Sequence, residues 1–409
     1  MQYVIIGNST AATFAVEGIR AQDKRGKIVI LSDEARPAYG RPLISYYLYG
    51  RIALENTAYR PASFYEENAV EVRLNTRAAA VDAERKRVLL ADGSFVPYDK
   101  LLVATGSRPF IPPTAGYESV ERRFTFMTMD DALALERELS PDRRVLVVGA
   151  GLIGLKCVEG ILDRVRSVTV VDMADRILSS ILDEEGAALV RRQLEEKGVR
   201  FVLGDRVAEY AGNTARLAGG AEIAFDVLVT AVGVRPNVEL VKEAGGAVGR
   251  GIVVDDRQRT SLPDVYAAGD NCESVDVCTG ARRILAILPN AALQGGTAGT
   301  NMAGGDAVFA QGAAFNAIGF FGSHIATAGV YEGESFTERG ENSYKKLFWK
   351  DNALKGFIII GDIDRAGIYT SLIREQTPLD TVDFELLKRH PALMAFAGTA
   401  RAEKLARRQ

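Results

Sequence analysis

The chain has 409 residues, of which 47% are hydrophobic and 25% are charged, a composition typical of globular proteins with large cores. Its length is sufficient for two or three domains. The formal net charge of -3 gives no general attraction to nucleic acid or to an anionic membrane, so we expect neither as a partner.

The amino-terminal segment predicts no export. The chain begins directly with an apolar strand, without a charged leader, an apolar signal core or a small-residue cleavage site. Residues 313–330 are the longest candidate for a membrane span, but polar residues and glycines interrupt them, so we expect buried strands there. Three cysteines fit a reducing compartment better than a disulfide framework. A cytoplasmic protein is therefore predicted.

A turn of the nucleotide-binding kind follows the first strand. Apolar residues 2–6 lead into Gly7, and a second apolar strand follows at residues 27–31. In such a βαβ unit the turn brings backbone N–H groups close to a pyrophosphate, and the helix N-terminus stabilises its charge. Ser9 and Ala12 stand where the strict pattern has glycine, so an ordinary βαβ turn remains the alternative.

Buried strands and amphipathic helices are predicted through the middle of the chain. Apolar residues 88–90, 100–104 and 227–231 are bounded by turn residues and predict strands. Helices are predicted at residues 129–139 and 183–197. The second of these places apolar side chains on one face and charged ones on the other, as a surface helix does.

A second nucleotide-binding turn, residues 149–154, contains three glycines between the apolar strand 144–148 and a helix. The following strand, residues 167–171, ends on Asp172, whose carboxylate can accept hydrogen bonds from an adenosine ribose and would repel a 2′-phosphate. We therefore favour NADH over NADPH, with Arg176 as the residue that could weaken this preference. Two such turns in one chain imply two cofactors and electron transfer between them.

The carboxyl-terminal part predicts a small mixed domain. Residues 345–350 and 354–362 form a β-hairpin pattern around the polar turn 351–353. Helices are expected to follow at residues 366–374 and 384–387.

No metal site is predicted. Cys157 is expected in the core of the helix after the second turn. Cys272 and Cys278 could form a redox pair or the corner of a metal site, but a structural role is favoured, because His324 and His390 are the only histidines and further ligands are hard to find.

Three further motifs occur in an order that is characteristic of one family. Residues 101–109 contain an Ala-Thr-Gly segment, residues 230–237 a related segment, and residues 264–270 a Gly-Asp segment. With both glycine turns, they make the chain resemble the FAD-dependent pyridine nucleotide oxidoreductases from residue 1 to about residue 301. The similarity is greatest to the branch of NADH:rubredoxin reductase-like proteins and nitrite reductase flavin modules.

The resemblance implies an α/β fold with two Rossmann-like dinucleotide-binding domains and a small α+β carboxyl-terminal domain. Residues 1–110 and 245–312 would form the FAD-binding domain, interrupted by an NAD(H)-binding domain at residues 111–244. Residues 313–409 would form a domain of the interface or dimerisation type, so a homodimer is one expectation.

The resemblance also implies the residues that hold the cofactors. For FAD they are Gly7, Ser9, Ala11, Ala12, Glu34, Arg41, Pro42, Ala78, Thr105, Gly106, Arg108, Gly269, Asp270, Pro289 and Asn290. For NADH they are Gly149, Gly151, Ile153, Gly154, Asp172 and Gly233. Glu34 would meet the adenosine ribose, and Asp270 the ribityl and pyrophosphate region. Arg41, Pro42 and Lys156 would face the flavin, and no side-chain acid or base is expected to be needed.

The loop at residues 39–42 reads Tyr-Gly-Arg-Pro and contains no cysteine, unlike the disulfide-reducing relatives. A thiol relay is therefore excluded there. The resemblance implies hydride transfer from NADH to FAD and onward transfer to an external acceptor, such as rubredoxin, ferredoxin or a nitrite reductase-like subunit. The alternatives are an NADH oxidase that uses oxygen directly and a redox-sensing scaffold that holds FAD and NADH.

Overall fold

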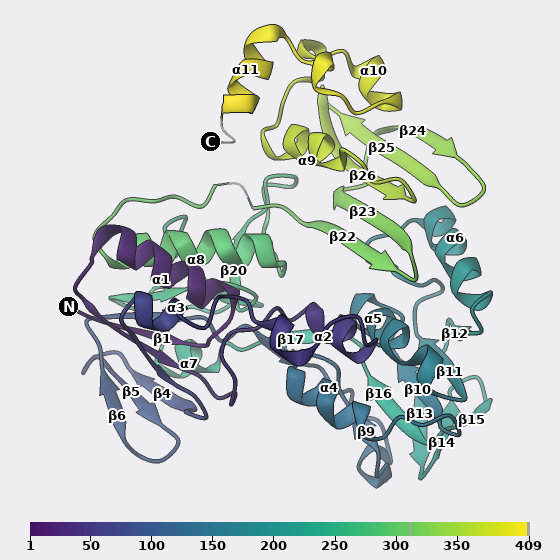
Figure 1. The fold of residues 1–409 in the computed structure, drawn as a ribbon, viewed down its shortest axis with the longest axis horizontal. Helices are drawn as coiled ribbons and strands as arrows, with labels where there is room; N and C mark the ends of the chain where they lie inside the picture. Colours follow the sequence, from purple (N-terminus) through teal and green to yellow (C-terminus); the bar gives the residue numbers. More distant parts are fainter. Residues whose placement is uncertain (311, 407–409) are drawn as a thin grey trace. The chain divides into compact units, whose positions relative to one another are not determined.

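The structure, a computed structural model, describes residues 1–310 and 312–406 and divides into two compact units (Figure 1). The first unit comprises Met1–Ser180, Val190–Ser274 and Arg283–Phe309. The second comprises Ile181–Leu189, Val275–Arg282 and the chain from Ala310 onward.

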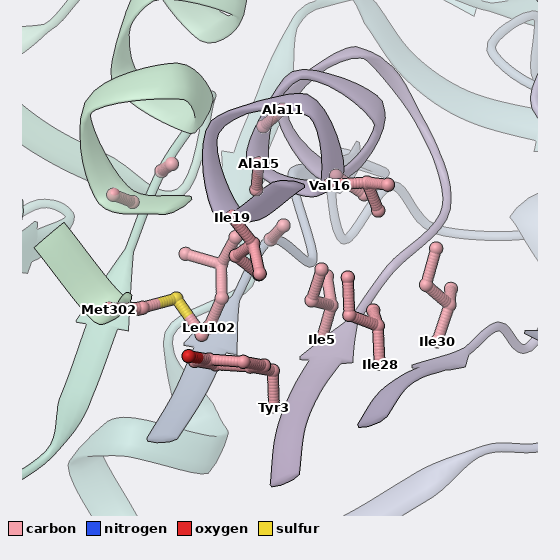
Figure 2. Close-up of a cluster of buried hydrophobic side chains, with 14 of the residues drawn as sticks. Tyr3, Ile5, Ala11, Ala15, Val16, Ile19, Ile28, Ile30, Leu102 and Met302 are labelled. Carbon is pink, nitrogen blue, oxygen red and sulfur yellow. The ribbon is translucent and has the colours of Figure 1, made fainter. Parts of the chain in front are cut away.

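The first unit contains a five-stranded parallel sheet in the order β19-β7-β1-β2-β3. Its strands are β1 (Gln2–Ile6), β2 (Lys27–Leu31), β3 (Val70–Arg73), β7 (Lys100–Val103) and β19 (Val265–Ala267). Helices α1 (Thr10–Gln22) and α8 (Leu288–Met302) pack on one face, where Tyr3, Ile5 and Ile28 point toward them (Figure 2). Val4, Val29 and their neighbours fill the opposite face. The alternation follows from the period of two in a strand.

Helices α1 and α8 approach each other closely because two glycines of α8 face the backbone of α1. A Cβ atom at Gly295 would lie 2.1 Å from the carbonyl oxygen of Ala11, and one at Gly299 would lie 2.1 Å from that of Ala15. A Cβ at Gly296, between them, would meet no atom within 4 Å. The contact therefore depends on the position of each glycine and not on glycine content.

Gly295→Ala is expected to destabilise the protein, whereas Gly296→Ala is expected to stabilise it. The first substitution forces two backbones apart, a form of overpacking that costs about 1–3 kcal/mol. The second only removes the entropic penalty of a glycine in a helix and should gain roughly 0.5–1 kcal/mol. Urea unfolding of the two variants beside the wild type measures both effects. Equal destabilisation of the two would contradict the packing described here.

A second five-stranded sheet of the first unit has the order β12-β11-β10-β16-β9 and is also parallel. Its strands are β9 (Arg123–Phe124), β10 (Arg144–Val148), β11 (Ser167–Asp172), β12 (Arg200–Leu203) and β16 (Val227–Thr230). The helices of this part are α4 (Met129–Glu136) and α5 (Leu152–Ile161), while α6 (Glu184–Glu195) is divided between the two units after Leu189. The two Rossmann-like sheets, the second inserted between strands of the first, confirm the predicted fold class.

The two connections between these sheets run side by side. Strand β8 (Ser107–Pro109) leads out of the first sheet, and β17 (Val234–Pro236) leads back toward it. The two strands pair with each other in the antiparallel sense. Asn237 strengthens the pairing, since its backbone N–H donates to the Gly106 carbonyl at 2.9 Å and its side chain donates to the Thr105 carbonyl at 2.8 Å.

Shorter elements complete the first unit. Its further strands are β4 (Ala78–Asp82), β5 (Arg87–Leu90), β6 (Phe95–Pro97), β13 (Val207–Ala211), β14 (Thr214–Leu217), β15 (Glu222–Ala224) and β18 (Ile252–Val253), with β20 (Cys272–Val275) and β21 (Arg282–Ile284) at its boundary. Its further helices are α2 (Leu43–Leu48), α3 (Phe64–Glu67) and α7 (Glu239–Glu243), with short 3-10 turns at Leu54–Thr57, Tyr117–Ser119 and Leu162–Arg164.

The second unit is built on an antiparallel sheet in the order β22-β23-β26-β25-β24. The strands are β22 (Phe315–Phe320), β23 (Ser323–Gly329), β24 (Glu334–Arg339), β25 (Tyr344–Lys350) and β26 (Ala353–Ile360). The helices are α9 (Ala366–Arg374), α10 (Phe384–Arg389) and α11 (Gly398–Ala406), with 3-10 turns at Leu379–Thr381 and Leu393–Ala395. The predicted hairpin is confirmed, because β25 and β26 pair around Asp351 and Asn352, both with positive φ.

The segment Ile181–Leu189 belongs to the second unit, although in the sequence it lies between β11 and β12 of the second parallel sheet. The Asp183 carboxylate accepts the Tyr344 hydroxyl at 2.7 Å and the Lys346 ammonium group at 3.1 Å. These hydrogen bonds hold the pKa of Asp183 below its usual range against the opposing effect of burial. The predicted domain boundaries remain a prediction.

Predicted helix ends differ from the observed ones by one to three residues. The helix predicted at 129–139 ends at Glu136, and the one predicted at 183–197 spans Glu184–Glu195, because the chain continues in each case through tighter i to i−3 turns. The helix predicted at 384–387 continues to Arg389. In the part of the chain that the structure describes, no helix is long and apolar enough to cross a bilayer.

Candidate functional site

A cleft of about 740 Å³ lies at the carboxyl ends of the strands of the first sheet. Gly7 follows β1, Glu34 follows β2, Thr105 follows β7 and Asp270 follows β19, and all four line this cleft. In an open parallel sheet this edge is where ligands bind.

The cleft brings together most of the residues predicted for FAD, from six separate segments. Those that line it are Gly7, Ser9, Ala11, Glu34, Arg41, Ala78, Thr105, Gly106, Arg108, Gly269 and Asp270. Four predicted residues lie outside the lining: Ala12 and Asn290 are buried, and Pro42 and Pro289 are exposed. Lining residues that the prediction missed include Asn8, Thr10, Arg77, Met127, Asn237, Glu243 and Leu288. Asn8 and Thr10 lie inside the first turn, and Asn237 ends a recognised motif, so the pattern held a signal for these three.

The first turn presents a helix N-terminus to the cleft. Gly7 has a φ of +109°, and a Cβ there would lie 2.2 Å from the Ala104 carbonyl oxygen, so only glycine fits. Ser9 caps α1 without a side-chain hydrogen bond, which leaves the first N–H groups of the helix available. The Asn8 side-chain nitrogen is buried and makes no hydrogen bond within the described residues. A phosphate oxygen would satisfy these donors, and this fits the FAD implied by the resemblance.

Glu34 is the centre of a hydrogen-bond network on one wall of the cleft. One of its oxygens pairs with the Arg41 guanidinium, and the other accepts the Tyr39 hydroxyl at 2.7 Å. The same hydroxyl accepts the backbone N–H of Met129 at 3.0 Å, and Arg41 donates to the Met127 carbonyl at 3.3 Å. Burial raises the pKa of Tyr39 well above its usual range. The network fixes Arg41 beside Glu34, so the two lie at the same part of the cleft.

Asp270 combines burial with a nearby positive charge. Burial raises the pKa of its carboxyl group, and the charge of Arg41 opposes this effect. A carboxylate whose charged form is disfavoured in this way gains strongly from donated hydrogen bonds. Ribityl hydroxyls are donors of this kind, so Asp270 also fits FAD.

The second turn is built as tightly as the first. Gly149 has a φ of +116°, and a Cβ there would lie 2.3 Å from the Ala231 carbonyl oxygen. A Cβ at Gly154 would lie 2.0 Å from the Gly149 carbonyl oxygen, so α5 starts directly against the turn. A Cβ at Gly151, the N-cap of α5, would meet no atom within 4 Å. The glycine there keeps open the space in front of the helix, where a pyrophosphate would lie.

Asp172 is held beside this turn. Its two oxygens accept the backbone N–H groups of Ala150 at 2.6 Å and Ala174 at 2.8 Å. The carboxylate is thereby fixed where it can also accept a ribose hydroxyl. Arg176 pairs with Asp175 at 3.0 Å, which offsets the positive charge that could otherwise attract a 2′-phosphate. Ile153 and Gly233, the other residues predicted for NADH, lie on the first turn of α5 and after β16.

Lys156, predicted to face the flavin, lies on α5 and contacts Glu159 and the ring of Tyr46. It is outside the described lining of the cleft.

The cysteines offer no reactive thiolate in the first unit. Cys157 and Cys272 are fully buried, and burial raises the pKa of the Cys272 thiol to about 12 and that of Cys157 further. Cys278 packs against the apolar core of the second unit.

Comparison with known proteins gives matches along most of the chain. A family described as pyridine nucleotide-disulphide oxidoreductase matches residues 1–295, and one described as the rubredoxin NAD+ reductase carboxyl-terminal domain matches residues 319–377. The NADH-dependent phenylglyoxylate dehydrogenase subunit epsilon of Aromatoleum evansii is 32% identical over 391 residues, which cover 92% of each chain.

Two further similarities concern an oxidase and a solved structure. The NADH oxidase of Methanocaldococcus jannaschii is 32% identical over 321 residues, which cover 76% of this chain and 71% of that protein. The structure of an NAD-dependent persulfide reductase from A. fulgidus superposes with a TM-score of 0.86 at 28% identity, covering 100% of this chain and 84% of that one.

Proposed function

Because the chain belongs to the pyridine nucleotide-disulphide oxidoreductase family, we propose that it passes electrons from NADH through FAD to an electron-carrier protein or a partner subunit. The family assignment confirms the predicted resemblance, the enzyme class and the two cofactors, FAD and NADH. The physiological acceptor is the part that is proposed.

The observation that carries this proposal is the match over nearly the whole chain to a protein named as one subunit of an NADH-dependent dehydrogenase. Its name makes that relative one chain of a protein with several subunits, which supports electron exchange with a partner polypeptide. The match of residues 319–377 to the carboxyl-terminal domain of rubredoxin NAD+ reductase supports an electron-carrier protein as the acceptor. The burial of Cys157 and Cys272 and the cysteine-free loop 39–42 support direct transfer without a thiol relay.

FAD, when bound, would supply the redox chemistry, namely acceptance of a hydride (two electrons and a proton) and release of electrons singly or as a pair. The chain's own residues bind and orient. We assign the cleft beside Gly7, Glu34 and Asp270 to FAD, and the turn beside Gly149 and Asp172 to NADH. Since Arg41 is ion-paired with Glu34, we assign it to the ribose and pyrophosphate half of the cofactor.

Anaerobic mixing of the yellow protein with NADH in a stopped-flow instrument tests the proposal. Rapid bleaching of the flavin band is expected with NADH and much slower bleaching with NADPH, since Asp172 would repel the 2′-phosphate. Adding a small iron–sulfur protein such as rubredoxin should then restore the yellow colour. Persistent colour with both nucleotides would refute the reductase and favour a scaffold.

An NADH oxidase is the second candidate, because one relative carries that name. It predicts oxygen uptake with NADH alone at a rate that matches or exceeds the rate of acceptor reduction. The reductase predicts that oxygen uptake is the slower of the two.

A further inference from the structure

Helix α2 and helix α5 pack directly against each other in the first unit. A Cβ atom at Gly160 of α5 would lie 3.2 Å from the Leu48 side chain of α2, and Leu48 is completely buried. Each helix begins at one of the two proposed cofactor sites: α2 follows Arg41, which lines the cleft, and α5 follows the glycine turn. The contact therefore sets the position of one site relative to the other.

A largely buried ion pair lies at this contact. Lys156 of α5 pairs with Glu159 one turn later, and their side chains are only 17% and 4% exposed. The Lys156 ammonium nitrogen lies 4.5 Å from the centre of the Tyr46 ring of α2. An ammonium group over an aromatic face is attracted to it, and more strongly when water is excluded.

A second polar contact joins the carboxyl-terminal ends of α2 and α5. Arg164, just after α5, donates to the Leu48 carbonyl at 3.0 Å and pairs with Glu136 at 3.2 Å. Glu136, on α4, accepts the Tyr47 hydroxyl at 2.7 Å. The carboxyl-terminal half of α2 is thus held at two points, by Arg164 at its last residue and by Lys156 at Tyr46.

We propose that Lys156 is a positioning residue: Glu159 holds its ammonium group on the Tyr46 ring, and this contact fixes α5, the helix after the NADH turn, against α2, the helix after loop 39–42. The consequence for electron transfer rests on the proposed function, because it requires both cofactors. Glu159 provides the charge that allows a lysine to stay at this depth, since a buried charge is retained only when it is paired. Tyr46 provides the attachment to the other helix.

Tyr46→Leu and Tyr46→Phe form a matched pair that isolates the aromatic face. Tyr46→Leu is expected to lower the limiting rate of flavin reduction by NADH about tenfold or more, because displacement of reacting groups by a fraction of an ångström is costly. The Kd for NADH should stay unchanged, since Tyr46 contacts α5 at Lys156 and is not part of the glycine turn 149–154. Tyr46→Phe keeps the ring and should behave as the wild type does. Lys156→Met should likewise lower the limiting rate of flavin reduction and leave the Kd for NADH unchanged. Lys156→Arg, which keeps the positive charge, should recover part of the rate.

Hydrogen exchange without nucleotide gives a readout that is independent of activity. Amides of α2 and α5 should exchange faster in Tyr46→Leu than in Tyr46→Phe, whereas amides of β1 and β2 should not change. Equal behaviour of the two Tyr46 variants in rate and in exchange would overturn the proposal. A raised Kd with an unchanged limiting rate in Lys156→Met would also overturn it, by showing that Lys156 binds the nucleotide. If NADH fails to reduce the wild-type flavin, the proposed function fails, and the exchange comparison still decides the positioning role.

Discussion

Asp270→Ala is expected to purify largely without FAD. The Asp270 carboxylate lines the cleft that we assign to FAD. Because burial disfavours its charged form, that form is stabilised strongly by donated hydrogen bonds. A hydrogen bond to a charged group contributes about 1.5–3 kcal/mol, so the Kd for FAD should rise by roughly tenfold to a hundredfold. The ratio of flavin absorbance to protein absorbance after purification, followed by titration of the apoprotein with FAD, measures the loss. A variant that keeps its full flavin content would refute the assigned role.

The apoprotein of Asp270→Asn should be more stable than the wild-type apoprotein at neutral pH. Burial raises the folded-state pKa of this carboxyl group above its unfolded value of about 3.9, so ionisation destabilises the empty protein. The penalty is absent below the unfolded pKa, grows as the pH rises toward the folded pKa, and is constant above it. The stability difference between the two apoproteins should therefore disappear as the pH falls below about 4. With FAD bound, the order should reverse.

Gly149→Ala is expected to slow the reduction of the flavin by NADH strongly while leaving FAD in place. The new methyl group would meet the Ala231 carbonyl oxygen at 2.3 Å, and a φ of +116° is strained for any residue with a side chain. The turn must shift by about an ångström, which lowers the rate of flavin reduction by NADH roughly a hundredfold. Stopped-flow reduction by NADH and chemical reduction by dithionite should then diverge, because dithionite needs no nucleotide site.

Gly198→Ala is the matched control. Gly198 also has a positive φ, +93°, but a Cβ there would meet no atom within 4 Å. This variant should lose about 1 kcal/mol of stability from backbone strain and keep its rate with NADH. An equal loss of NADH reduction in both variants would show that strain alone, and not the position of the glycine turn, is responsible.

The segments that the sequence predicted well are those whose structure depends on near neighbours. The apolar runs at residues 2–6, 27–31 and 144–148 became central parallel strands, because strands buried on both faces are apolar throughout. The hairpin at residues 345–362 was readable for a similar reason, since its polar tip adopts the positive φ angles of a tight turn.

What the sequence could not reveal depends on contacts between distant segments. Glu34 and Arg41 were assigned to different ends of FAD, but their ion pair and the Tyr39 hydroxyl bring them to one wall of the cleft. The glycines of α8 gave no signal of their own, because their role depends on the backbone of α1. Lys156 could be recognised as unusual on α5, but its partner Tyr46 lies more than a hundred residues earlier in the chain.

The order of strands in the first sheet bears on how the protein is made. Strand β19 forms the edge of the first sheet beside β7, and α8 packs beside α1 on one face of that sheet. Both β19 and α8 are nevertheless synthesised after all strands of the second sheet. At about 5–20 residues per second, a ribosome needs on the order of ten seconds or more between completing α1 and completing α8. During that interval α1 lacks its helical neighbour and the strand that leads to Asp270 has not yet been added. The nucleotide turn of the inserted sheet can form first, so we expect binding of FAD at the proposed cleft to be a late event in the maturation of this chain.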